Sequence, residues 1–142
     1  MTKILLPVDG SECALRAVDH LIAHCAWFGA VPEIHVLNVH LPIPIGRVQA
    51  HIGSEALHAY YREESQAVLL GAQTRLDAAG LFHTTHIHVG QPAEVIAKVA
   101  AELACDLIVM GSHSRSGVLG MILGSVANRA LHLAHCPVLL VK

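Results

Sequence analysis

Residues 110 to 126, MGSHSRSGVLGMILGSV, combine four glycines with four serines directly after the apolar run CDLIVM. Glycines let main-chain N–H groups approach an anion closely, and successive N–H groups can form a concave anion site. Gly124 and Ser125 precede a segment with helical spacing, and the N-terminus of a helix carries unpaired donors and a partial positive charge. The segment therefore indicates a phosphate site, to which further groups could contribute hydrogen bonds or charge: Ser112, Ser116, Ser125 and Arg115.

This segment matches neither of two common phosphate motifs. The P-loop pattern G-x-x-x-x-G-K-[ST] is absent, and so is the dinucleotide pattern G-x-G-x-x-G. Glycine spacing alone fits a surface loop without a ligand equally well. The elements that position the segment must therefore help to decide between these two interpretations.

Short apolar runs alternate with amphipathic segments along all 142 residues. Strands are predicted at 3–8, 33–39, 83–89, 106–110 and 137–141. Helices are predicted from Ser11 to about Phe28, over about 55–79, from near Pro92, and over about 125–135, with a loop at 40–54. This alternation predicts one α/β domain, residues 1–142, with an open parallel sheet and helices on both faces.

Ligands of open parallel sheets bind beyond the carboxyl ends of the strands, where the strand order reverses. If the first strand is central, the reversal lies between the first and fourth strands. The segments leaving these two strands are PVDGS and MGSHSRSG, the most turn-rich strand exits in the chain. Sequence pattern and topology thus point to one crevice.

Composition excludes several classes of partner. The net charge is −2 and no basic block occurs, which argues against a nucleic-acid or anionic membrane surface. The N-terminus is interrupted too early for a signal peptide, and no apolar run is long enough to span a membrane, so we expect a cytoplasmic protein with reduced cysteines. The twelve histidines include three close pairs, but none has a third ligand at motif spacing, so no metal site is expected: His20/His24, His86/His88 and His132/His135.

Three long stretches resemble the universal stress protein family: KILLPVDGSECALRAV, VGQPAEVIAKVAAELACDLIVMGSHSRSG and LGSVANRALHLAHCPVLLVK. The family's nucleotide motif is G-x2-G-x9-G-[ST], and here Gly111, Ser114 and Gly124-Ser125 occupy its positions. The resemblance implies a Rossmann-like, adenine nucleotide alpha hydrolase-like fold with strand order 3-2-1-4-5. It also implies a cytoplasmic homodimer. One branch of the family binds ATP, and the other lacks the glycine motif and does not.

The resemblance further implies roles for individual residues. Around the base and ribose it places Pro7, Val8, Asp9, Val39, Met110 and Gly111. Around the triphosphate it places His113, Ser114, Gly124, Ser125 and Val126, and Arg115 could add charge. Mg²⁺ is expected to accompany ATP. Asp9 has an alternative role as a turn residue that caps the first helix.

Ser114 departs from the motif, which has glycine there. A left-handed backbone at a non-glycine residue costs roughly 1–2 kcal/mol, or about a ten- to thirtyfold weaker site. A serine hydroxyl could recover part of this by bonding a phosphate oxygen. We therefore expect ATP binding to be retained, with AMP or ADP as alternative nucleotides.

The last strand is expected at the edge of the sheet. A bare apolar edge invites pairing, and an isologous dimer would cover it. The expected dimer residues are Pro137, Val138, Leu139, Leu140 and Val141, with an edge protected by a loop as the alternative.

The leading hypothesis is a dimeric, ATP-binding stress-response module that signals through nucleotide-dependent conformation. Two alternatives remain: a structural or interaction protein without nucleotide, and a slow ATPase with His113 or Asp9 near the phosphates. No residue set predicts efficient catalysis.

Overall fold

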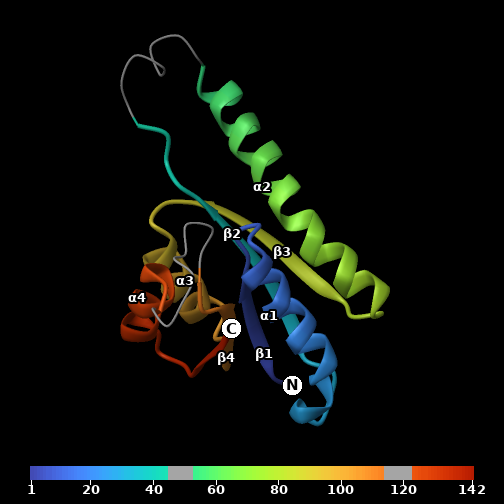
Figure 1. Cartoon of the computed structure of the whole chain (residues 1–142). Helices are drawn as coiled ribbons and strands as arrows, with labels where there is room; N and C mark the ends of the chain where they lie inside the picture. Colours follow the sequence, from blue (N-terminus) through green and yellow to red (C-terminus); the bar gives the residue numbers. More distant parts are fainter. Residues whose placement is uncertain (45–52, 114–122) are drawn as a thin grey trace.

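The computed structural model describes residues 1–44, 53–113 and 123–142, and shows a five-stranded sheet in the order β3-β2-β1-β4-β5 (Figure 1). All neighbouring strands pair in parallel. The strands are β1 (Lys3–Pro7), β2 (Glu33–His40), β3 (His83–Val89), β4 (Leu107–Gly111) and β5 (Val138–Val141). The helices are α1 (Glu12–Ala23), α2 (Ser54–Ala78), α3 (Pro92–Glu102) and α4 (Ser125–Leu133), with a 3-10 turn at Cys25–Phe28. The predicted fold class and strand order are confirmed.

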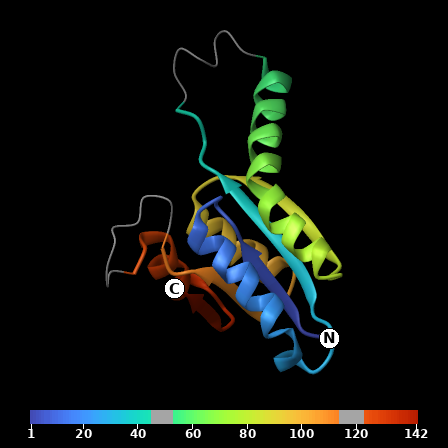
Figure 2. The same cartoon turned by 45° about the vertical axis from the view of Figure 1, so that its right-hand side comes forward.

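The sheet is central because its strands are apolar on both faces. On one face Ile4, Leu6 and Val36 pack with α1 and α2, and on the other Leu5 and Leu37 pack with α3 and α4. Figure 2 shows α1 and α3 on opposite sides of the strands. Alternate residues of β1 therefore enter two different cores, and burial on both faces requires continuous apolar runs of the kind found in parallel sheets.

The first helix begins as predicted but ends earlier. The Ser11 side chain accepts a hydrogen bond from the Ala14 N–H at 3.1 Å, as an N-cap should. The predicted end at Phe28 is wrong, because α1 stops at Ala23 and the chain tightens into the 3-10 turn. There the Trp27 N–H donates to the His24 carbonyl at 2.9 Å, and Gly29 closes the turn with φ of 74°.

The second helix is longer than the sheet requires. Its buried residues recur every three or four positions from the third turn of the helix onward: Tyr61, Ser65, Leu69, Ala72 and Leu76. Its first turns project beyond the carboxyl edge of the sheet, where β2 also ends (Figures 1 and 2). Within the described part of the chain, no helix is both long and apolar enough to cross a membrane.

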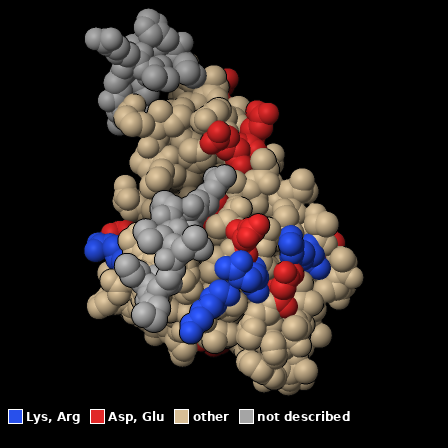
Figure 3. All heavy atoms as spheres, viewed as in Figure 1, with Lys and Arg blue, Asp and Glu red and all other residues tan. Residues whose placement is uncertain are grey.

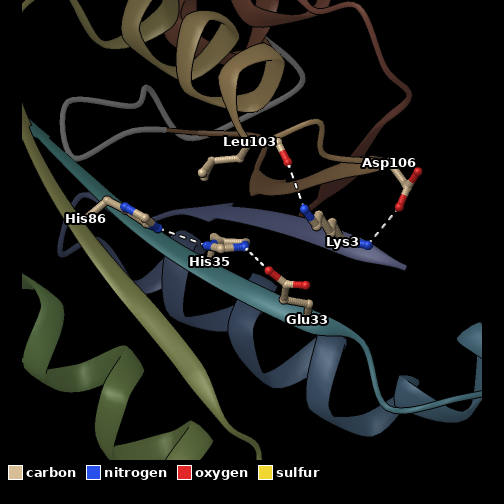
Figure 4. A network of polar contacts seen from close by, with 6 residues as sticks. All are labelled: Lys3, Glu33, His35, His86, Leu103 and Asp106. Carbon is tan, nitrogen blue, oxygen red and sulfur yellow. Dashed lines mark hydrogen bonds and ion pairs between the residues drawn. The ribbon is translucent and has the colours of Figure 1, made fainter. Parts of the chain in front are cut away.

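A row of polar side chains lies on the sheet face where β2 and β3 meet (Figure 4). His35 is buried on β2, and its Nδ1 lies 2.9 Å from His86 Nε2 on β3. His35 Nε2 lies 2.9 Å from Glu33 Oε1. His86 therefore forms a side-chain contact between the two strands. Among the described residues, no group of three or more His, Cys, Asp or Glu is arranged to hold a metal ion.

The histidine pair predicts a pH-dependent stability. Burial lowers the pKa of His86, and the nearby His35 and His88 lower it further. The unfolded chain then binds a proton at His86 more readily than the folded chain, so stability falls as pH decreases below about 6.5. We expect His86→Gln to show a smaller loss of melting temperature between about pH 7 and pH 5 than the wild type. The exposed His132 provides the control, since His132→Gln should keep the wild-type pH dependence, and equal slopes for all three proteins would contradict the assignment.

Candidate ligand-binding site

A pocket of about 810 Å³ opens at the carboxyl edge of the sheet, over the reversal of strand order between β1 and β4. It gathers most of the residues that the sequence placed around a ligand: Pro7, Val8, Asp9, Val39, Met110, Gly111, His113, Ser125 and Val126. Gly124 directly precedes α4 beside them. Ser114 and Arg115 lie outside the described residues. The two predicted strand exits therefore meet at one pocket.

Other lining residues were not foreseen from the sequence. They come from the end of β2 and from α2 and α3: Leu37, Asn38, His40, Leu41, Glu64, Ala67, Val68, Gln91, Pro92 and Ile96. Gln91 and Pro92 lie just beyond the carboxyl end of β3. The rule that ligands bind at the carboxyl ends of parallel strands could therefore have predicted them. Glu64, Ala67 and Val68 gave no such signal, because the sequence does not show which turn of α2 reaches the pocket.

The exit of β1 is fixed by main-chain and amide bonds. The Val8 N–H donates to the Leu37 carbonyl at 2.8 Å, and the buried Asn38 amide donates to the Val8 carbonyl at 2.9 Å. Asp9 Oδ1 accepts the Ser11 N–H at 2.9 Å and so forms the turn into α1. Asp9 also lines the pocket, so its role in the turn does not remove it from the pocket wall.

The exit of β4 is joined to the start of α4. The Ser112 N–H donates to the Val141 carbonyl, and the Gly124 N–H donates to the Ser112 carbonyl, both at 2.8 Å. These bonds hold the first turn of α4 beside the end of β4. The buried Ser112 hydroxyl contacts His113 Nδ1 at 2.8 Å, so Ser112 orients this ring rather than facing the pocket itself.

The electrostatic character of the pocket is mixed. The first turns of α3 and α4 line it, and the N-terminal ends of helices favour anions. Asp9 and Glu64 add carboxylates at the β1 and α2 sides. On the face in Figure 3, basic side chains lie beside acidic ones, so the described part of this face forms no continuous basic surface. No Lys or Arg is among the described residues that line the pocket, so the N-terminal ends of α3 and α4 are the main-chain features there that favour an anion.

An open parallel sheet with a pocket at its switch point defines a Rossmann-like α/β domain of the adenine nucleotide alpha hydrolase-like type. The chain belongs to the universal stress protein family, whose model matches residues 1–142.

Individual relatives agree with this assignment. Universal stress protein MJ0531 of Methanocaldococcus jannaschii is 35% identical over 140 residues, covering 99% of this chain and 81% of the relative. The solved structure of MJ0577 from the same organism has a TM-score of 0.82 and 31% identity, covering 99% of this chain and 95% of the other. A universal stress protein solved in complex with cAMP has a TM-score of 0.72 and 24% identity, covering 99% of this chain and 97% of the other.

Proposed function

We propose that this protein binds adenine nucleotides, ATP with Mg²⁺ foremost, and acts as a dimeric cytoplasmic stress-response module through nucleotide-dependent conformation. The observation that carries the proposal is the Gly124–Ser112 main-chain bond, which holds the positive end of α4 at a pocket that Val39 also lines. A relative of the same fold carries cAMP, which supports a nucleotide as the occupant.

In the proposed arrangement the base lies toward the exits of β1 and β2, near Pro7, Val8, Asp9 and Val39. The ribose lies along Met110 and Gly111. The phosphates lie toward His113 and the first turn of α4, with Gly124, Ser125 and Val126. Mg²⁺ would be bound through the phosphate oxygens of ATP.

The direct test uses the protein as purified. Denaturation followed by mass spectrometry should release an adenine nucleotide, and calorimetry on the emptied protein should show ATP binding. Adenosine should bind more weakly than ATP, because it lacks the group that the α4 end attracts. A protein that releases no nucleotide and gives no heat with millimolar ATP would instead be the structural or interaction member of the family.

The dimer part of the proposal rests on β5, the strand at one edge of the sheet. The Pro137 and Val141 carbonyls accept from β4, and main-chain groups alternate in direction along a parallel strand. The N–H groups of Val138 and Leu140 therefore point to the open edge, where a second copy could pair with them.

We expect the wild type to be a dimer by light scattering and Leu140→Pro to be a monomer. Proline removes one outward N–H and leaves the bonds to β4 in place. Leu140→Ala loses the same side chain but keeps the N–H, so it should stay dimeric. A wild-type monomer, or equal dissociation of both variants, would exclude pairing through β5.

A further inference from the structure

A polar contact joins the end of β2 to the middle of α2 at the wall of the pocket. His40 Nε2 lies 2.5 Å from Glu64 Oε2, and His40 Nδ1 lies 2.6 Å from the Leu41 carbonyl oxygen. The Tyr60 hydroxyl donates to the other Glu64 oxygen at 2.7 Å. His40 and Glu64 both line the pocket.

These contacts determine the protonation of the ring. A carbonyl oxygen and an ionised carboxylate can only accept hydrogen bonds, so both His40 nitrogens must donate. Only the imidazolium form carries a hydrogen on both nitrogens. A neutral ring would turn a lone pair toward one of these oxygens and lose that bond. We treat Glu64 as ionised because its side chain is about half exposed, and an exposed carboxyl group loses its proton at about pH 4.

The remaining surroundings of His40 leave Glu64 as its ion-pair partner in the described structure. On α2 the Tyr61 ring lies edge-on, with 4.9 Å between ring centroids, and the Tyr61 hydroxyl accepts the Ile43 N–H at 2.8 Å. On β3 the residue paired with His40 is Val89, and α3 contributes the uncharged Gln91 to the pocket. Among the described residues of the pocket wall, the other titratable groups are Asp9 and His113.

His40 is also tied through its main chain. Its carbonyl accepts the Gly90 N–H at 3.0 Å, one residue before the N-cap of α3. The residue before it, Val39, lines the pocket where the base is proposed to lie. The same residue thus links α2 through its ring and the approach to α3 through its backbone.

We propose that His40, held as an imidazolium by Glu64, is a positioning residue of the ligand site. It fixes the α2 wall beside Val39, so ligand affinity falls as the pH rises through the titration of the ring. This inference rests on the proposed nucleotide binding. The imidazole group titrates near pH 6.5 in peptides, which sets the pH range in which the effect is to be measured.

The affinity test compares the dissociation constant for ATP at about pH 6 and pH 8 in the wild type and two variants. In His40→Gln, the weakening between the two pH values should be about three- to tenfold smaller than in the wild type. His132→Gln, an exposed change on α4, should keep the wild-type ratio. Any effect of pH on the ATP phosphates or on the rest of the protein is common to all three proteins, so it cancels in this comparison. A His40→Gln ratio equal to that of the wild type overturns the proposal.

A second measurement needs no ligand. Nitrogen NMR of the His40 ring should show both nitrogens protonated at about pH 6, and Glu64→Gln should lower the protonated fraction at that pH. A neutral ring in the wild type at about pH 6 overturns the proposal independently of nucleotide binding. If the ring is protonated but ATP binds at neither pH, the proposed function is what fails, together with the role of His40 in it.

Discussion

Replacing Gly111 by alanine is expected to destabilise the protein by about 2–3 kcal/mol, although the change adds one methyl group. A Cβ at this position would lie 2.9 Å from the carbonyl carbon and 3.0 Å from the carbonyl oxygen of Cys13. These are backbone atoms in the first turn of α1, and they cannot move aside as a side-chain end can. The Cys13 thiol also donates to the Val141 carbonyl at 3.3 Å, so a displacement of α1 would reach β5. Denaturant unfolding measures the loss.

Gly71→Ala is the matched control for this prediction. A Cβ at Gly71 would meet Leu15 Cδ2 at 3.2 Å, which is the end of a side chain able to turn away. Gly71 lies inside α2, where alanine is favoured over glycine by roughly 0.5–1 kcal/mol. We therefore expect Gly71→Ala to be neutral or stabilising. Equal stabilities for the Gly111 and Gly71 variants would show that α1 is not packed against Gly111 as described.

The sequence pattern predicted the sheet well because the signal is local. Each strand is a short apolar run between turn residues, and β3 was predicted at its observed bounds. The helix ends were less predictable, since they depend on competing main-chain bonds. The end of α4 at Leu133 is an example. Pro137 disfavours helical geometry at the residue before it, Cys136. The helix ends still earlier, because Ala134 already has an extended ψ of 142°.

The candidate site divides in the same way. Residues at the exits of β1 and β4 could be predicted because parallel strands deliver their carboxyl ends to one edge. Glu64 could not, since it reaches the pocket only through the packing of α2 on the sheet. The contact between His35 and His86 also needed the strand register, because 51 positions separate the two residues. Gly111 was predicted as a ligand neighbour, and its close contact with Cys13 appears only in the packed structure.

Ser125→Asp is expected to weaken ATP binding by about tenfold to a hundredfold while leaving the fold intact. Ser125 is exposed, begins α4 and lines the pocket at the proposed phosphate end. A carboxylate a few ångströms from a phosphate costs about 1–4 kcal/mol in a partly hydrated site. The same carboxylate stabilises α4 by roughly 0.3–1 kcal/mol, because it lies at the positive end of the helix. Weaker binding with equal or higher melting temperature is therefore the expected pair of results, measured by calorimetry and thermal unfolding.

Two comparisons separate charge from shape in this result. Ser125→Asn has nearly the same size as Ser125→Asp but no charge, so it should lose much less affinity for ATP. Adenosine has no phosphate, so its affinity should be almost the same for the wild type and for Ser125→Asp. If adenosine binding falls as much as ATP binding, Ser125 faces the base or the ribose and the proposed direction of the nucleotide is reversed. If neither ligand is affected, the first turn of α4 does not contact the ligand, and the anion site must be sought elsewhere along the pocket.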